Sequence, residues 1–138
     1  MRVGDMMSKK VTLVDPGETI RSAAQRMKNE DVGALPVGEN DRLVGMVTDR
    51  DIAVRAVAAG RGPDTAIRDV MSGEIKYCFE DDDANDVAEN MADQQVRRLP
   101  VVNRDKRLVG IVSLADFARH SEGRKHVVRA MSGIAQSH

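Results

Sequence analysis

The stretches GMVTDRDI (45–52) and GIVSLADF (110–117) state one pattern twice, and this pattern decides the fold. Each reads as a buried strand that runs directly into a helix. In each, a hydroxyl residue stands three positions before an aspartate; the two pairs are Thr48 with Asp51 and Ser113 with Asp116. Recurrence of the same residue types at the same spacing indicates an internal duplication.

Further matches extend the duplication over most of the 138 residues. The matching segments are DMMS (5–8) with DVMS (69–72), ALPV (34–37) with RLPV (98–101), and RLVGMV (42–47) with RLVGIV (107–112). The offset rises from 64 to 65 residues before the last pair, because one residue is added in a polar loop, where insertions are tolerated. The sequence therefore predicts two repeats, residues 1–63 and 64–121, joined by the helix-breaking stretch GRGPDTA (60–66).

Both repeats begin with the same expected elements. A short β-prone run, at 11–14 or 75–79, precedes an amphipathic helix with an N-cap residue, Thr19 or Asp83. The helix shows apolar residues at i, i+3, i+4 and i+7, which is one buried stripe. The stripe residues are Ile20, Ala23, Ala24 and Met27 in the first repeat, and Ala84, Val87, Ala88 and Met91 in the second.

Two apolar strands around a polar turn then predict a hairpin, and a second helix begins at Thr48 or Ser113. The first of these helices is expected to end near Gly60, a good C-cap residue. The element order is therefore β-α-β-β-α, twice. A unit of about 60 residues is marginally stable alone, so we expect the repeats to pack through their strands as halves of one α/β module. Residues 122–138 form a tail, predicted to be a short helix.

Composition and motifs exclude several classes of protein. Twenty-one Lys and Arg balance 22 Asp and Glu, for a net charge of −1, so no basic footprint indicates nucleic acid. The single cysteine, Cys78, cannot form an internal disulfide, and no signal peptide or membrane-spanning run is present, which favours a cytoplasmic protein. No nucleophile has a matching histidine base, and no phosphate loop or zinc-protease motif occurs, so we expect no enzyme.

The duplicated segments resemble the CBS-domain family, and specifically a tandem CBS pair, or Bateman module, over residues 3 to 120. The resemblance rests on the DMMS and DVMS segments, the ALPV and RLPV strands, and the two phrases that end in Asp51 and Asp116. It implies a small mixed sheet and two helices in each repeat, related by a pseudo-two-fold axis. It also implies homodimers, and adenosyl ligands bound in clefts between the repeats.

The resemblance also implies site residues. The hydroxyls of Thr48 and Ser113 would contact phosphate, and the carboxylates of Asp51 and Asp116 would contact ribose hydroxyls. Adenine would lie near Thr12 or Lys76. The remaining neighbours would come from the strand residues around each proline, which are Ala34, Leu35, Pro36, Arg98, Leu99 and Pro100. Apart from the resemblance, Arg50 is a candidate for contact with a phosphate.

Each of these assignments has a structural alternative. A hydroxyl residue followed three positions later by an acid also resembles a helix capping box. Arg50 suits an exposed helix position, and Arg97 with Arg98 suits a solvated pair at a strand edge. The acids of EDDD (80–83) are better explained by the dipole of a helix that starts there than by a bound metal, so no metal site is predicted.

The combined prediction is a stand-alone regulatory module, or sensor, that binds an adenine nucleotide and signals to an unidentified protein in trans. AMP is the favoured ligand, followed by ATP or NAD, with S-adenosylmethionine as a further candidate, and no catalytic cofactor is expected. A surplus of small apolar residues after Asp51 favours a homodimer. The alternative is a ligand-free interaction scaffold whose aspartates only cap helices.

Overall fold

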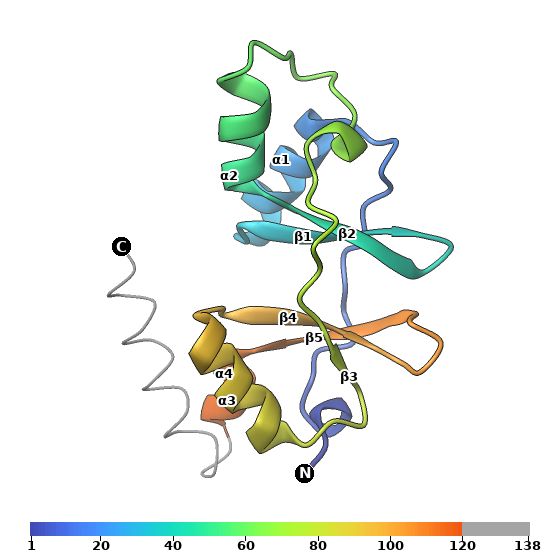
Figure 1. The fold of residues 1–138 in the computed structure, drawn as a ribbon, viewed down its shortest axis with the longest axis vertical. Helices are drawn as coiled ribbons and strands as arrows, with labels where there is room; N and C mark the ends of the chain where they lie inside the picture. Colours follow the sequence, from blue (N-terminus) through green and yellow to red (C-terminus); the bar gives the residue numbers. More distant parts are fainter. Residues whose placement is uncertain (120–138) are drawn as a thin grey trace. The chain divides into compact units, whose positions relative to one another are not determined.

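The computed structural model describes residues 1–119, which fold as two compact units. The first-repeat unit consists of Thr12–Ile75. Among the described residues, the second-repeat unit combines Met1–Val11 with residues 76–119. Figure 1 shows the two units with the chain coloured along its length. The predicted tail, residues 122–138, lies outside the described residues.

The first-repeat unit contains an antiparallel hairpin and helices packed against it (Figure 1). Its elements are α1 (Ile20–Glu30), β1 (Ala34–Glu39), β2 (Arg42–Thr48), α2 (Asp49–Asp51), a π-helical turn (Ile52–Val57) that continues α2, and a single 3-10 turn (Ile67–Asp69). The expected strand at 11–14 is reduced to one parallel bridge between Val14 and Val37. A turn follows at once, in which Asp15 accepts a hydrogen bond from the Gly17 amide (2.8 Å), so the strand cannot lengthen.

The predicted cap of α1 is confirmed and its predicted stripe is narrower than expected. The Thr19 side chain accepts a hydrogen bond from the Ser22 amide (3.1 Å). Ile20, Ala23 and Met27 are buried. Ala24 is exposed, so its place in the buried stripe was predicted wrongly, because the small hairpin covers only one narrow face of the helix.

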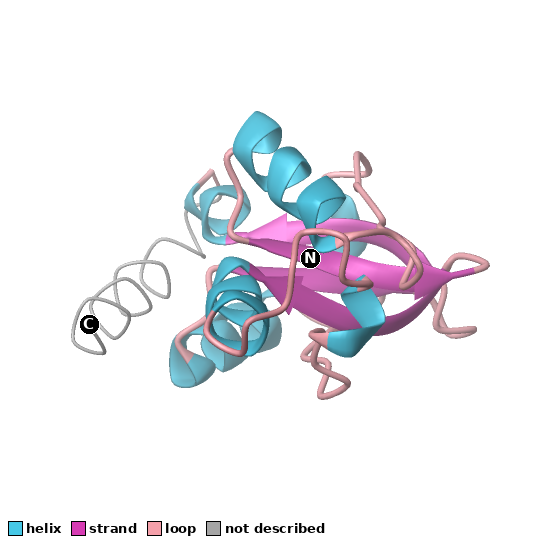
Figure 2. Ribbon diagram, turned by 90° about the horizontal axis from the view of Figure 1, so that it is seen from above, coloured by secondary structure: helices cyan, strands magenta, loops and turns pink. Residues whose placement is uncertain are grey.

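The second-repeat unit contains a three-stranded mixed sheet. Its elements are a 3-10 turn (Val3–Asp5), β3 (Cys78–Phe79), α3 (Ala84–Gln94), β4 (Arg98–Val102), β5 (Leu108–Ser113) and α4 (Leu114–Ala118). β3 pairs in parallel with β4, and β4 pairs antiparallel with β5. Figure 2 distinguishes these strands from the helices and loops. Asp83 caps α3 by accepting from the Asp86 amide (3.3 Å), and all four predicted stripe residues of α3 are buried.

The first segment of each repeat packs in the unit formed mainly by the other repeat. Residues 69–72, at the start of the second repeat, pack on the first-repeat hairpin, where Ser72 bridges Met46 of β2. Residues 5–8, at the start of the first repeat, pack on the second-repeat sheet, where Ser8 bridges Ile111 of β5. The boundaries 1–63 and 64–121 thus describe the duplication in the sequence, while the packing follows the exchanged segments.

Each exchanged segment belongs to the core of the unit that receives it. Ile67 and Val70 are fully buried in the first-repeat core with Val14, Val37 and Val47. Val3 is fully buried in the second-repeat core, which also holds Phe117 and Met91.

No helix within residues 1–119 has the length and apolar character needed to cross a membrane.

Candidate functional site

The first of the two repeated phrases forms a complete capping box at the junction of β2 and α2. The Thr48 amide donates to Oδ2 of Asp51 (2.9 Å), and the Asp51 amide donates to Oγ1 of Thr48 (3.0 Å). The Asp51 side chain is 14% exposed. The capping interpretation is therefore confirmed as geometry, and it leaves the carboxylate partly accessible.

The second phrase holds its aspartate more tightly. Oδ2 of Asp116 accepts from the Ser113 amide (2.8 Å) and from the Ser113 hydroxyl (3.2 Å). Oδ1 of Asp116 pairs with the guanidinium of Arg119. Asp116 is only 4% exposed and is the one buried charged residue among those described. The two aspartates therefore differ in how much of each carboxylate is still open to a ligand.

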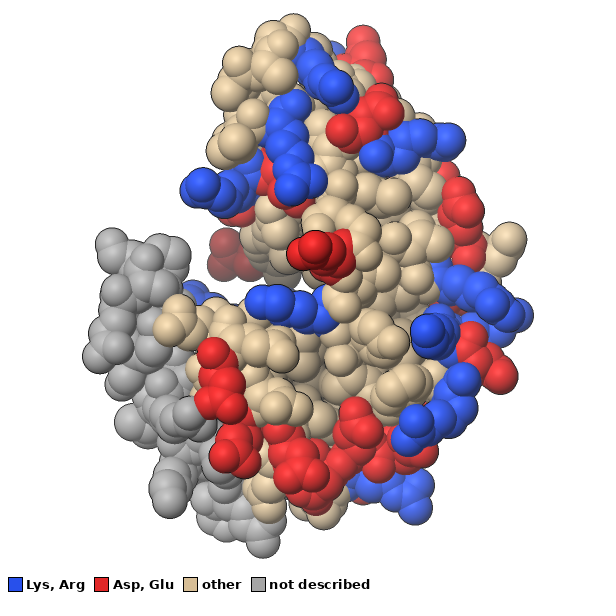
Figure 3. Space-filling model, viewed as in Figure 1, with Lys and Arg blue, Asp and Glu red and all other residues tan. Residues whose placement is uncertain are grey.

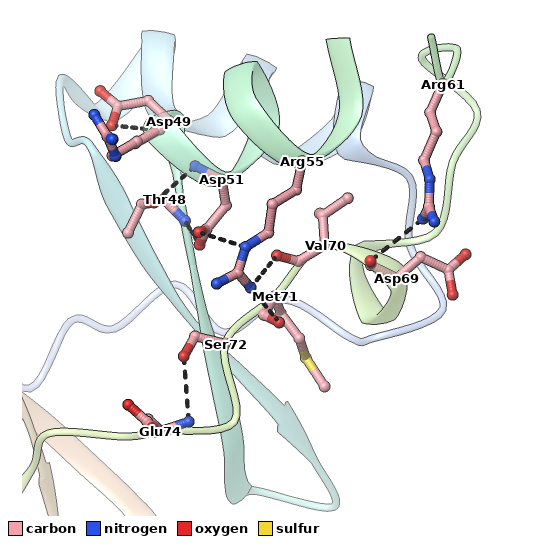
Figure 4. Close-up of polar contacts among 11 residues, drawn as sticks. Thr48, Asp49, Asp51, Arg55, Arg61, Asp69, Val70, Met71, Ser72 and Glu74 are labelled. Carbon is pink, nitrogen blue, oxygen red and sulfur yellow. Dashed lines mark hydrogen bonds and ion pairs between the residues drawn. The ribbon is translucent and has the colours of Figure 1, made fainter. Parts of the chain in front are cut away.

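The second carboxylate oxygen of Asp51, Oδ1, lies near the guanidinium of Arg55. Nε of Arg55 lies 3.8 Å from Oδ1 of Asp51, which is an ion pair and too long for a hydrogen bond. Nη1 of the same guanidinium donates to the carbonyl oxygens of Val70 and Met71, at 3.3 Å each. Figure 4 shows Arg55 between the capping box and these two carbonyls.

The start of α2 already uses its first three backbone amides. The Asp49 amide donates to the carbonyl of Gly33 (2.9 Å), and the Arg50 amide donates to Oδ1 of Asp49 (2.8 Å). The third amide, of Asp51, donates to Thr48 as described above. A phosphate bound at this helix start would have to replace one of these three acceptors.

The strand residues predicted around each proline lie beside the phrases. Ala34 of β1 is the register partner of Thr48, and Arg98 of β4 is the register partner of Ser113. The residues that follow them in each strand are buried; these are Leu35, Pro36, Leu99 and Pro100. The structure therefore brings each hydroxyl residue next to the first residue of its neighbouring strand.

Of the three remaining predicted residues, one is hydrogen-bonded to another side chain and two are exposed. Thr12 directs its hydroxyl to the carboxylate of Glu30 at the end of α1. Lys76 is exposed, and so is Arg50, which matches the structural alternative given for Arg50. Their predicted ligand contacts stay predictions.

The acidic run at 80–83 serves the fold. Arg104 forms two hydrogen bonds with Asp81 (2.8 and 3.0 Å) and lies 4.2 Å from the centroid of the Phe79 ring. The hydrogen bonds from Arg104 lower the pKa of Asp81. Asp82 accepts from the Phe79 amide (2.9 Å), and Asp83 caps α3. Within residues 1–119, no three His, Cys, Asp or Glu side chains are grouped to hold a metal ion.

Cys78 is suited to packing. It is buried in the second-repeat core, and burial is the main cause that raises its pKa to about 12. The side chain therefore stays a neutral thiol near neutral pH, whereas metal binding and nucleophilic attack need the thiolate.

On the face shown in Figure 3, Lys and Arg side chains are interspersed with Asp and Glu, in keeping with the balanced composition.

Two segments of the chain match the family model for the CBS domain, residues 3–57 and 67–123. The chain belongs to the CBS-domain family. Its two CBS domains cover most of the sequence, as the duplicated segments predicted, and the α/β fold with small sheets agrees with solved CBS pairs.

Among its relatives, the CBS domain-containing protein YhcV of Bacillus subtilis is 41% identical over 133 residues, which cover 96% of this chain and 94% of YhcV. Hypoxic response protein 1 of Mycobacterium tuberculosis is 45% identical over 118 residues, covering 84% and 82% of the two chains. A solved structure of hypoxic response protein I with two coordinated zinc ions superposes with a TM-score of 0.74 over 87% of this chain and 98% of that chain.

A second solved structure contains adenosyl ligands. The CBS pair of protein MJ0100, in complex with 5′-methylthioadenosine and S-adenosyl-L-methionine, superposes with a TM-score of 0.73. It is 29% identical, and the match covers 90% of this chain and 98% of that chain. A relative with the same fold therefore binds ligands that carry an adenosyl group.

Sequence reasoning missed Arg55. Arg55 follows Asp51 by four residues, a spacing that places two side chains on one helix face, so its ion pair was readable from the sequence. Its contacts with Val70 and Met71 were not, because they depend on the exchange of segments between the units.

Proposed function

We propose that this CBS pair is a regulatory module that binds adenosyl ligands through Asp51 and Asp116 and signals their presence to another protein. The observation that carries the proposal is the same in both units. An aspartate in the helix that follows the hairpin accepts a hydrogen bond from the last strand residue, and this strand residue pairs with the residue before a Leu-Pro pair. The adenosyl ligands bound by the MJ0100 relative support it.

The chemistry fits a ribose. Two vicinal hydroxyls donate hydrogen bonds to one carboxylate, and such bonds are strengthened by the negative charge. Within residues 1–119, the ion pair of 3.8 Å with Arg55 is the only interaction of Oδ1 of Asp51. Oδ1 of Asp116 already pairs with Arg119, so a ribose at that position must replace an existing partner. We therefore place the stronger site at Asp51.

One observation favours the alternative function, an interaction scaffold that binds no ligand. Asp51 forms a capping box with Thr48, and Asp116 accepts hydrogen bonds from the amide and hydroxyl of Ser113, so both aspartates have a structural role. The two functions differ in one respect: a scaffold gains no stability from adenosyl compounds.

A thermal-shift panel separates the two functions. We expect at least one of AMP, ADP, ATP, NAD, 5′-methylthioadenosine and S-adenosylmethionine to raise the melting temperature. A ligand at 100 times its dissociation constant stabilises the folded state by about 2.7 kcal/mol at one site. GTP serves as the control for nonspecific effects of a nucleoside triphosphate. Equal melting temperatures across the whole panel would support the scaffold.

We also propose that the chain forms a homodimer through the helix that continues α2. Val54 is 52% exposed and Val57 is 67% exposed, and both belong to the π-helical turn. Exposed apolar groups on one short helix are suited to a self-complementary interface. A cytoplasmic location and the absence of enzymatic activity stay predictions from the sequence.

The dimer is tested by Val57→Glu. We expect the unmodified protein to have about twice the mass of the 15.1 kDa chain in light scattering at micromolar concentration. Val57→Glu should shift the mass to that of the monomer, because an interface cannot bury an unpaired charge at low cost. Lys28→Glu, an exposed change on α1, is the control and should leave the mass unchanged. A monomeric unmodified protein would contradict the proposal.

A further inference from the structure

The helix that follows the Asp51 capping box changes its winding at once. α2 ends at Asp51, and Ile52–Val57 forms a π-helical turn in which the Ala58 amide donates to the carbonyl of Ala53 (2.9 Å). Single π turns within helices are rare and occur frequently at functional sites. Arg55 lies in this turn.

The guanidinium of Arg55 joins two parts of the first-repeat unit. It makes the 3.8 Å ion pair with Asp51 and the two 3.3 Å hydrogen bonds to the carbonyls of Val70 and Met71 (Figure 4). A planar guanidinium with a fixed fork of donors can serve both partners at once, which a lysine ammonium on its flexible stem cannot do in the same geometry.

The segment that Arg55 reaches is paired in turn with β2. The Met46 amide donates to the Ser72 carbonyl (3.0 Å), and the Ser72 amide donates to the Met46 carbonyl (2.9 Å). Thr48, the first residue of the capping box, ends the same strand. The contacts therefore form a closed circuit from Asp51 through Arg55 and the segment Val70–Ser72 to β2, and back to the capping box.

We propose that Arg55 is a positioning residue that couples the Asp51 carboxylate to the segment Val70–Ser72. This rests on the proposed function, since the ligand that uses Asp51 would be an adenosyl compound. A ligand that fixes the carboxylate fixes its partner Arg55 and thereby holds Val70–Ser72 on β2. By thermodynamic linkage, a change that loosens this segment lowers the affinity for the ligand by the same factor by which the ligand stabilises the segment.

Arg61 provides a matched control. Its Nη1 donates to the carbonyl of Asp69 (3.3 Å), directly before the residues that Arg55 contacts (Figure 4). Arg61 lies beyond the helix and makes no ion pair with Asp51 in the described part of the chain. Arg61→Met therefore removes a hydrogen bond to the residue just before the segment Val70–Ser72, whereas Arg55→Met removes two hydrogen bonds to the segment together with the link to the carboxylate.

Site-resolved amide hydrogen exchange on the full chain tests the coupling without any ligand. In Arg55→Met, the amides of Ser72 and Met46 should exchange about 2- to 12-fold faster than in the unmodified protein, the factor that corresponds to one net hydrogen bond. Asp51→Asn should accelerate the same two amides, because the guanidinium loses its anchor. Arg61→Met should leave them unchanged. Equal exchange in Arg55→Met and Arg61→Met overturns the proposal.

The second arm adds S-adenosylmethionine and, separately, AMP. In the unmodified protein and in Arg61→Met, the compound that binds should slow exchange at Ser72 and Met46. In Arg55→Met this slowing should disappear and the dissociation constant should rise, with partial rescue in Arg55→Lys. Unchanged affinity and slowing in Arg55→Met overturn the coupling. Failure of both compounds to bind the unmodified protein counts against the proposed function, while the ligand-free arm still decides the role of Arg55.

Discussion

The double variant Asp51→Asn/Asp116→Asn is expected to lose binding of adenosyl ligands. Each substitution removes the negative charge that strengthens hydrogen bonds from ribose hydroxyls. A hydrogen bond to a charged group contributes about 1.5–3 kcal/mol, which corresponds to about a 10- to 150-fold change in affinity. Titration calorimetry with S-adenosylmethionine and AMP measures the loss, and Asp51→Asn should account for more of it than Asp116→Asn.

Stability should follow the opposite order. Asp116 is 4% exposed and accepts from two groups of Ser113, so Asp116→Asn should destabilise the ligand-free protein by about 1–3 kcal/mol. Asp51 is more accessible, and Asp51→Asn should cost about 0.3–1 kcal/mol, as expected for a charge near a helix start. Urea unfolding of both variants measures these differences.

A deoxy ligand provides the control for the ribose role. 2′-Deoxy-AMP lacks one of the two hydroxyls that would donate to the carboxylate. If Asp51 binds ribose, the loss in affinity caused by Asp51→Asn should shrink for 2′-deoxy-AMP relative to AMP. Losses of equal size for the two ligands would show that Asp51 does not contact the 2′-hydroxyl, and no loss for either ligand would show that it acts only as a helix cap.

The second large effect is expected at the glycines of the repeated phrases. A Cβ on Gly45 would lie 2.8 Å from the carbonyl oxygen of Ser72, and one on Gly110 would lie 2.8 Å from the carbonyl oxygen of Ser8. Both contacts involve backbone, so the exchanged segments would have to move. Gly45→Ala and Gly110→Ala should each destabilise the protein by about 1–3 kcal/mol, the usual cost of overpacking.

Gly62 offers the matched control because a Cβ at that position meets nothing within 4 Å. Gly62→Ala should be neutral or stabilise by up to about 1 kcal/mol, since alanine restricts the unfolded chain. Urea midpoints of the three variants test the expectation. If Gly45→Ala and Gly110→Ala were as stable as Gly62→Ala, the exchanged segments would not lie against β2 and β5 as described.

The packing of the exchanged segments against these glycines could not be predicted from the sequence. The duplication predicted both hairpins, the caps at Thr19 and Asp83, and the helix starts at Thr48 and Ser113, because each depends on neighbouring residues. It could not predict the exchange of residues 5–8 and 69–72. The two segments have nearly the same sequence, so each is chemically suited to either hairpin, and only the path of the whole chain decides between them.

The same limit applies to the candidate site. The repeated phrases identified Asp51 and Asp116 but not the difference between them. The carboxylate of Asp116 is closed to further partners because Arg119 pairs with it and the core around Phe117 buries it. The contacts of Arg55 with Val70 and Met71 join residues far apart in the sequence. The single bridge at Val14, in place of the expected strand at 11–14, likewise depends on pairing with Val37, which is distant in the sequence.

Native mass spectrometry of the unmodified chain with S-adenosylmethionine and with AMP tests the central claim most directly, since it counts bound molecules. We predict that at least one of the two compounds adds its own mass to the protein, with one molecule per chain bound first and lost in Asp51→Asn. A chain that stays unliganded in the presence of both compounds at millimolar concentration, or an Asp51→Asn variant that binds as the unmodified chain does, would contradict the account.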